Sequence, residues 1–399
     1  MNSDKKYGLI LFIVLFFLSY SSQGQDELDF KPMASEAAGL GFINADSTVL
    51  VNFRFRMQNR IGVTTNSLSD LTINTVEARV RRLRLRMDGY FLTPKFGYYI
   101  QLSFSRGDLD WDNSGIPNVL RDAVVFYFFT PDTYLTFGQS KLPGNRQRVI
   151  SSGMQQFAER SILNTRFNID RDFGVKFNHQ FQITNQHFRK QVALTMGEGR
   201  NAIVSDNGLA YTSRMEWLPL GEFTSDGDYF EGDLLREPKP KLSLGGAFSY
   251  NERAIRTGGQ IGQFLESPTD IRTLIIDGIF KYQGFSLYGE YFFRNATRFI
   301  VNDQSGENTF IYSGKGAMLQ TSYLFKNGYE YALRFATIEP LTAIKPFTSG
   351  DTEATFGISK YLKNHQIKAQ FNIGYYNNHF LFAERNDNWF AQFQIEVGL

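Results

Sequence analysis

Polar and apolar residues alternate one by one along most of this chain, and that alternation constrains the fold more than any other feature. In residues 49–58, VLVNFRFRMQ, the odd positions carry Val, Phe and Met. The even positions 52, 54, 56 and 58 carry Asn, Arg and Gln. The last eleven residues, WFAQFQIEVGL, alternate in the same way. A period of two is typical of β-strands with one apolar and one polar face. The sequence therefore predicts an all-β protein.

Sixteen candidate strands follow this pattern. They cover residues 48–62, 75–91, 95–105, 121–129, 133–141, 172–182, 188–196, 209–218, 240–250, 270–282, 285–294, 315–325, 329–338, 352–362, 365–376 and 386–399. Short connections such as TPK at 93–95 and KNG at 326–328 alternate with long ones, the longest being the thirty residues 142–171. An even number of strands joined by alternating tight turns and long loops is the pattern of a transmembrane β-barrel.

Two observations bear on alternatives to this barrel. A soluble β-sandwich also has strands with one apolar face, so the alternation by itself is compatible with it. The 39 Phe and 20 Tyr residues favour the membrane barrel, whose interfaces carry aromatic girdles.

Residues 219–239 stand where the alternation of connections calls for a tight turn, but they are too long for one. They are either an insertion on the side of the tight turns or a short hairpin.

The first 24 residues have the features of a secretory signal peptide. Lys5 and Lys6 precede eleven apolar residues from Gly8 to Leu18, and small residues stand before Gln25. A membrane-spanning helix would need about 20 apolar residues. We therefore expect a cleaved signal peptide at 1–24, a short periplasmic segment at 25–47 and a barrel of about 16 strands at 48–399. The barrel would lie in the outer membrane of a Gram-negative bacterium.

Three segments carry a resemblance to a known family. They are VRRLRLRMDGYF, the following strand FGYYIQLSFS, and residues 137–175, FGQSKLPGNRQRVISSGMQQFAERSILNTRFNIDRDFGV. In their order and spacing they resemble the phosphate-selective porin O and P family, in the form common in Bacteroidetes, over about residues 39–399. The resemblance implies a sixteen-stranded homotrimeric outer-membrane channel for small anions such as phosphate. It also implies that the third outer loop, here residues 142–171, folds inward and constricts the pore. Many outer-membrane barrels end in Phe, whereas this chain ends in Leu399.

The second strand, VEARVRRLRLRMDGYF, carries five arginines within eight residues. The apolar residues occupy even positions up to Val80 and odd positions from Leu83, so their parity switches between Arg81 and Arg82. In a regular strand one set of arginines would face lipid, at a cost of roughly 2 to 4 kcal/mol for each side chain at the bilayer midplane. We therefore predict a β-bulge at Arg81 and Arg82, or else that Arg79 and Arg81 lie above the membrane.

Inward-facing arginines would form a column of permanent positive charge that binds oxyanions. We therefore predict a passive channel for small anions, such as phosphate or other oxyanions. The resemblance supports Arg81, Arg82 and Lys141 as the positions most similar to known anion-site residues. The candidate anion-binding and pore-lining residues are Arg79, Arg81, Arg82, Arg84 and Arg86, with Arg54 and Arg56 beside them and Lys141, Arg146 and Arg148 facing them.

Other functions have less support in the sequence. A weakly selective diffusion porin also has lumen arginines, paired with carboxylates, for which Glu77, Asp88, Asp108, Asp110, Asp112 and Glu159 are available. An outer-membrane enzyme on a barrel would need a nucleophile motif, and none occurs. Four separated His residues and no Cys predict neither a metal site nor a cofactor. The balance of 42 basic and 40 acidic residues argues against nucleic acid as a partner, whereas the predicted apolar exterior implies contact with outer-membrane lipid.

Overall fold

The computed structural model describes residues 39–108, 118–202, 208–303, 306, 308–379 and 386–399. The predicted signal peptide at 1–24 lies outside these residues, as does the first part of the predicted segment 25–47. No helix in the part of the chain that the structure describes is both long and apolar enough to cross a membrane.

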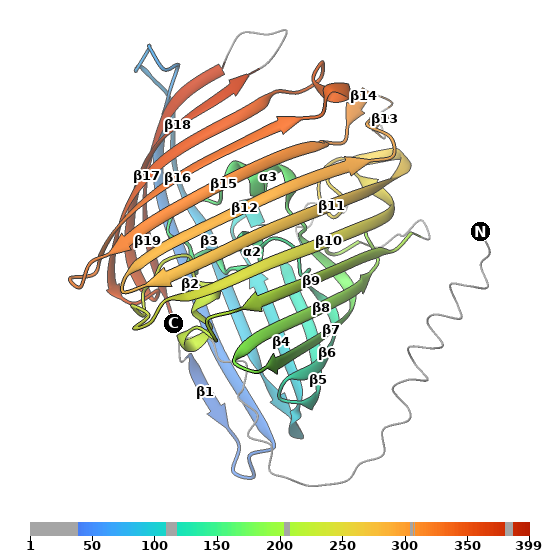
Figure 1. Cartoon of the computed structure of the whole chain (residues 1–399), viewed down its shortest axis with the longest axis vertical. Coiled ribbons are helices and arrows are strands. Elements are labelled where there is room, and N and C mark those ends of the chain that lie inside the picture. Colours follow the sequence, from blue (N-terminus) through green and yellow to red (C-terminus); the bar gives the residue numbers. More distant parts are fainter. Residues whose placement is uncertain (1–38, 109–117, 203–207, 304–305, 307, 380–385) are drawn as a thin grey trace.

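Sixteen antiparallel strands close into one barrel, which confirms the predicted fold class (Figure 1). Each strand hydrogen-bonds to the next, and the last strand pairs with the first from Phe390 opposite Thr64 to Gly398 opposite Arg56. The strands are β2 (Val49–Thr65), β3 (Ile73–Phe91), β4 (Thr93–Ser103), β5 (Leu120–Thr130), β6 (Thr133–Lys141), β7 (Arg171–Ile183), β8 (Gln186–Thr195), β9 (Ala210–Leu218), β10 (Lys241–Arg256), β11 (Phe264–Tyr282), β12 (Phe285–Ala296), β15 (Gly314–Leu324), β16 (Tyr329–Pro340), β17 (Gly350–Lys363), β18 (Ile367–His379) and β19 (Asn386–Gly398).

The barrel has its apolar side chains outside and its polar side chains inside. Along β16, exposed and buried residues alternate over the whole strand. Leu333 and Phe335 are more than half exposed, whereas Glu330 and Arg334 are buried. A soluble sandwich would bury the apolar face between its two sheets. The sandwich alternative is therefore wrong, and the apolar exterior is that of a transmembrane barrel.

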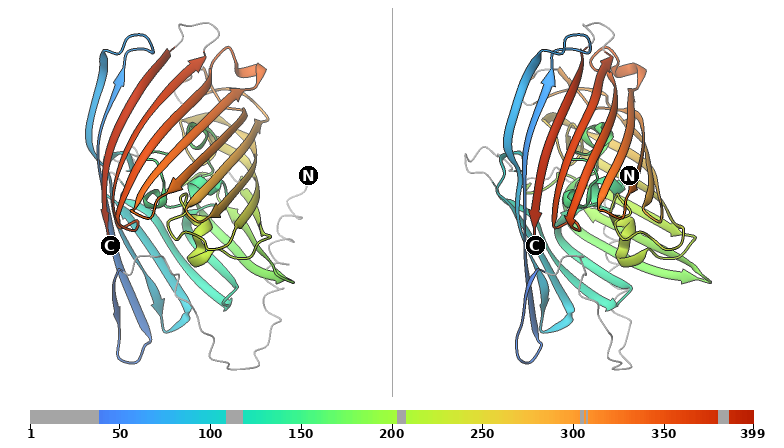
Figure 2. Two further views of the ribbon diagram at one scale, coloured as in Figure 1. Left: turned by 60° about the vertical axis from the view of Figure 1, so that its left-hand side comes forward. Right: turned by 90° about the vertical axis from the view of Figure 1, so that its left-hand side faces the viewer.

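The longest connection folds into the barrel. We call residues 142–170, which join β6 to β7, loop L3; it contains α2 (Arg146–Val149), η2 (Ser152–Met154) and α3 (Ile162–Phe167). Figures 1 and 2 show α2 and α3 inside the ring of strands. Leu163 and Phe167 of α3 are fully buried in an apolar cluster that also includes Phe292 of β12. L3 is thus packed against the inner wall of the barrel.

The connection 219–239 is an insertion with no hairpin in it. It contains η3 (Thr224–Tyr229) and turns toward the lumen, where Phe230 packs with Ile150 and Met154 of L3. Of the two interpretations left open by the sequence, the insertion is correct. We call residues 219–239 the inner connection, because it supports L3 from the side of the tight turns.

A short strand precedes the barrel. β1 (Leu40–Ile43) pairs with the beginning of β2, from Leu40 opposite Phe53 to Ile43 opposite Leu50. The alternation of polar and apolar residues predicted no strand there. Because β19 pairs with β2 only up to Arg56, β1 continues the same edge of β2 beyond the end of β19. Two further short strands, β13 (Ile300–Asn302) and β14 (Asn308–Phe310), form a hairpin between β12 and β15.

The β-bulge predicted on the arginine strand is present. In the ladder between β2 and β3, Gln58 lies opposite Arg82 and the next residue, Asn59, lies opposite Val80. Arg81 is therefore the extra residue. Val80 remains on the outer face and is about half exposed, whereas Arg81 and Arg82 both reach the same loop carboxylate inside the barrel. The bulge thus keeps both guanidinium groups away from lipid.

Deleting Arg81 should leave a stable barrel, because Gln58 would still face Arg82 and Asn59 would still face Val80 in an uninterrupted ladder. Deleting Val80 instead should destabilise the barrel, because Arg81 would then take the outward position opposite Asn59. The expected loss is roughly 2 to 4 kcal/mol near the bilayer midplane and less toward its edges. Urea titration of the folded fraction in lipid vesicles measures both variants. Equal stability of the two variants would contradict this explanation of the bulge.

Candidate functional site

A basic cavity of about 520 Å³ lies between β3, L3 and the loops at the mouth of the barrel. Its walls come from β3, β5, β6, β7 and the end of β10, from L3, and from the connections that follow β4, β8 and β10. Among the described residues, ten basic side chains and three carboxylates line it. The basic residues are Arg81, Arg82, Arg84, Arg121, Lys141, Arg148, Arg160, Arg171, Arg200 and Arg256, and the carboxylates are Asp108, Glu159 and Asp170.

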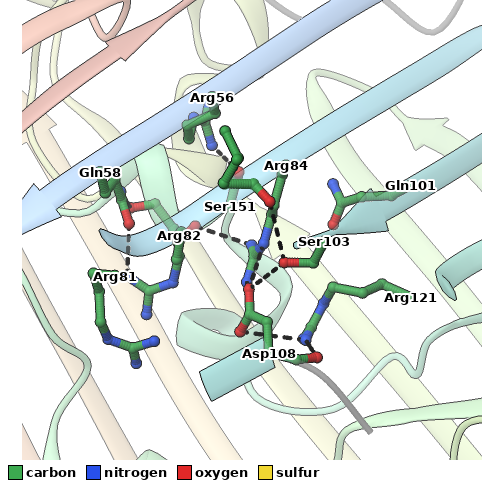
Figure 3. A network of polar contacts seen from close by, with 12 residues as sticks. Arg56, Gln58, Arg81, Arg82, Arg84, Gln101, Ser103, Asp108, Arg121 and Ser151 are labelled. Atoms are coloured by element: carbon green, nitrogen blue, oxygen red, sulfur yellow. Dashed lines mark hydrogen bonds and ion pairs between the residues drawn. The ribbon is translucent and has the colours of Figure 1, made fainter. Parts of the chain in front are cut away.

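Glu159 of L3 binds arginines from two strands. Its carboxylate accepts hydrogen bonds from Nη1 of Arg60 on β2, from Nε and Nη2 of Arg81 and from Nη2 of Arg82, the last two at 3.1 and 3.3 Å. Arg82 also donates to Oε1 of Gln58 at 2.8 Å, as Figure 3 shows. The bulge is what lets two consecutive arginines reach one carboxylate.

Asp108 holds a second pair of arginines. Its Oδ2 accepts from Nε of Arg84 at 2.8 Å and from Oγ of Ser103 at 3.0 Å, and its Oδ1 lies 3.3 Å from Nη1 of Arg121 (Figure 3). Arg121 is itself the extra residue of a second bulge, because Gln101 and Leu102 of β4 lie opposite Asp122 and Leu120 of β5. Arg121 and its neighbour Asp122 are therefore both directed into the barrel, as Arg81 and Arg82 are.

Asp170, at the end of L3, holds the third group. It accepts from Nε of Arg148 at 2.9 Å and from Nη1 of Arg171 at 3.4 Å. Arg171 also binds both carboxylate oxygens of Asp122, at 2.8 and 3.0 Å. Each loop carboxylate of the cavity therefore bridges at least two guanidinium groups.

These carboxylates remain ionised because of their neighbours. Burial alone would raise the pKa of each one. Arg82 and Arg81 nevertheless lower the pKa of Glu159, Arg84 and Arg121 lower that of Asp108, and Arg148 and Arg171 lower that of Asp170, all below their ordinary values. The three carboxylates of the cavity therefore carry negative charge at neutral pH.

The structure brings together five of the ten candidate residues. Arg81, Arg82, Arg84, Lys141 and Arg148 line the cavity. Nζ of Lys141 donates to the carbonyl oxygens of Val149 and Ile150, at 2.8 and 3.5 Å, so that this lysine also holds the backbone of L3.

Four candidates lie on the inner wall but are not among the residues that line the cavity. Arg54 and Arg86 lie near the Asp88 carboxylate, with closest N–O distances of 3.6 and 2.8 Å. Arg56 pairs with Glu396 at 2.9 Å, and Arg79 pairs with Glu77. The Arg56 guanidinium also lies against Gly153 of L3. The approach is so close that a Cβ atom at this glycine would overlap the guanidinium.

Arg146 has a different position from the other candidates. It is fully buried, and its guanidinium contacts Asp277 of β11 at 2.7 Å, Glu216 of β9 at 3.0 Å and Asp228 of the inner connection at 3.4 Å. The neighbouring Gln147 donates its backbone N–H to Glu290 of β12 at 2.8 Å. Arg146 therefore anchors L3 to the barrel wall.

Several residues of the cavity were not predicted from the sequence. They are the basic residues Arg121, Arg160, Arg171, Arg200 and Arg256. Arg121 and Asp122 are two consecutive charged residues in a strand, as Arg81 and Arg82 are, but no change in the parity of apolar residues marks them. For Arg160 nothing in the sequence marks the position, because its side chain donates to carbonyl oxygens of L3 that only the folded loop brings near.

Within the described residues, no group of three or more His, Asp or Glu side chains could hold a metal ion.

A closed barrel with an apolar exterior, a charged interior and an inward-folded loop is the architecture of an outer-membrane porin. The sequence model of one family, phosphate-selective porin O and P, matches residues 51–330, and the chain belongs to that family. Its location is the outer membrane of a Gram-negative bacterium, and its family and fold indicate a channel rather than an enzyme.

Solved structures with the same fold are porins and outer-membrane channels. The anion-selective porin from Comamonas acidovorans is 12% identical, with a TM-score of 0.56 over 88% of this chain and 99% of that chain. The outer-membrane channel DcaP of Acinetobacter baumannii is 10% identical, with a TM-score of 0.55 over 91% of this chain and 100% of that one. OprB of Pseudomonas putida is 8% identical, with a TM-score of 0.56 over 88% and 94%. No curated protein matches the sequence.

Replacing Arg146 with Met should destabilise the barrel by about 3 to 5 kcal/mol, because three buried carboxylates would lose their shared cation. The same change at Arg148, two residues further along α2, should have a much smaller effect, since that side chain pairs with one carboxylate and is 16% exposed. Urea unfolding of the two variants in the same vesicles gives the comparison. A loss at Arg148→Met as large as at Arg146→Met would contradict the anchoring role of Arg146.

Proposed function

We propose that the protein is a passive channel for small anions. The basic cavity and the arginine column beside it select these anions. The observation that carries this proposal is the set of ten basic side chains around three carboxylates in a cavity bounded by L3. Fixed positive groups inside a pore favour anions and repel cations. Solutes would cross down their own gradients, so the proposed function requires neither a cofactor nor a catalytic step.

Oxyanions such as phosphate are the solute class that suits these side chains best. A guanidinium presents a planar fork of N–H donors that matches two oxygens of a phosphate or carboxylate group. The description of the family as phosphate-selective supports this choice, and so does the name of the Comamonas acidovorans protein as an anion-selective porin. In this proposal L3 narrows the pore, and Arg81, Arg82 and Lys141 are the residues that a permeating anion meets.

A weakly selective diffusion porin is the alternative with its own support. Each of Asp108, Glu159 and Asp170 pairs with at least two arginines of the cavity, so part of the positive charge is already balanced. Opposite charges across a lumen give a transverse field rather than a strong preference for one sign of ion. The ion selectivity of the wild-type channel separates the two proposals.

We also propose that the channel is a homotrimer embedded in outer-membrane lipid. OmpT of Vibrio cholerae, which has the same fold with a TM-score of 0.51 at 9% identity, is described in a trimer form. The exposed apolar side chains on the outside of the barrel supply the surface for lipid and for neighbouring copies.

The wild-type channel should give a reversal potential of the sign expected for anion flow in a planar bilayer under a KCl gradient, because positive charge lines its cavity. Replacing chloride with phosphate should preserve the anion preference and lower the conductance at high concentration, because phosphate binds the guanidinium groups more tightly. A cation preference would overturn the proposal. A reversal potential near zero would favour the diffusion porin.

Changing Arg81 and Arg82 together to Ala should move the reversal potential toward zero, because two cations of the cavity are lost. The matched control is Lys315→Ala with Lys345→Ala, which removes an exposed and a partly exposed lysine that pair with Glu339 and are not among the residues that line the cavity. This control should retain the wild-type reversal potential. Unchanged selectivity in the arginine variant would show that these two residues serve the structure alone.

A further inference from the structure

The arginine cluster near the bulge already holds an anionic group. Arg60, Arg81 and Arg82, from two adjacent strands, all donate to the carboxylate of Glu159. Both side-chain hydrogen bonds of Arg81 go to this carboxylate. A carboxylate presents two oxygens to guanidinium groups in the same way as a phosphate or another oxyanion does. Glu159 therefore occupies the positions that the oxygens of a bound oxyanion would take.

Glu159 faces the same cavity as the arginines that it binds. Its side chain is 30% exposed, whereas that of Arg82 is 3% exposed, and both residues line the cavity. Nη2 of Arg82 and Nε and Nη2 of Arg81 already donate hydrogen bonds to the Glu159 carboxylate. An anion that binds these nitrogen atoms must therefore compete with the carboxylate for them.

The backbone of L3 around Glu159 does not depend on this side chain. The backbone N–H of Ala158 donates to Oδ1 of Asn372 at 2.8 Å, and Nη1 of Arg334 donates to the carbonyl oxygen of Glu159 at 2.9 Å. Arg160 donates to the carbonyl oxygens of Gln147 and Ile150 at 2.8 and 2.9 Å. With both neighbours fixed, the Glu159 side chain can change its rotamer while L3 stays in place.

We propose that Glu159 is an internal counter-anion, which occupies the arginine cluster between passages and which each permeating anion must displace. This inference deepens the proposed function and rests on it, because it concerns how the same cavity releases its anions. A channel conducts well only when its sites bind ions weakly enough to let them leave. A carboxylate that returns to the cluster replaces the interactions that the departing anion gives up, and so speeds its release.

The test compares Glu159→Gln with wild type and with Glu77→Gln in planar bilayers. Glu77 is a suitable control because it also pairs with Arg60, at 2.7 Å, and with Arg79, but it is not among the residues that line the cavity. Single-channel conductance is recorded against phosphate concentration. We expect the half-saturating concentration to fall about tenfold in Glu159→Gln, with a lower maximal conductance, because repulsion from a unit charge at the site is removed. Glu77→Gln should keep the wild-type values.

Other outcomes would overturn the inference. An unchanged half-saturating concentration in both Glu159→Gln and a second variant, Glu159→Ala, would show that the carboxylate does not compete with anions. A higher conductance together with passage of larger polyethylene glycols would show that Glu159 instead holds L3 in place. An equal shift in Glu77→Gln would show a general effect of lumen charge. The wild-type reversal potential, measured in the same experiment, tests the proposed function separately: an anion preference with no shift in Glu159→Gln refutes the inference alone.

Discussion

The cost of exposing a guanidinium group to hydrocarbon, roughly 2 to 4 kcal/mol at the bilayer midplane, determines how the basic wall of this barrel is built. A regular strand can direct only every second side chain inward, yet β3 carries Arg81 and Arg82 in succession. The bulge at Arg81 resolves the conflict, and β5 resolves the same conflict for Arg121 and Asp122 in the same way. The contacts of Arg81 with Glu159 and of Arg121 with Asp108 follow from these two irregularities.

Burial separates two kinds of charge inside the lumen. Arg146 and Arg148 lie two residues apart on α2, but the first is enclosed by three carboxylates while the second borders the cavity. A buried guanidinium shared by several carboxylates fixes one loop geometry, since moving it would leave charges unpaired. The partly exposed Arg148 instead contributes its charge to the wall of the cavity. The same residue type therefore anchors L3 at one position and lines the cavity at the other.

Much of the fold could be predicted because a membrane barrel repeats one signal from strand to strand, the alternation of polar and apolar residues, and most of the barrel strands carry it. β1, with four residues, is too short to show a period. The bulge on β3 was predictable because apolar residues on both sides of Arg81 and Arg82 show the change of parity. On β5 only Leu120 precedes Arg121, so the sequence offers no parity to compare. The partners of Arg146 come from β9, β11 and the inner connection, and the sequence does not show which arginine of L3 they surround.

The position of β1 limits where β19 can lie along β2. The ladder between β19 and β2 closes the barrel, and its register determines how far the first and last strands are staggered. Gly398 of β19 lies opposite Arg56, while β1 occupies the next residues of the same edge, up to Phe53. A shift of β19 along β2 toward the tight-turn end would have to displace β1. β1 thus acts as a stop for the closing strand, and β1 and β19 together fix the register that sets the stagger of the barrel.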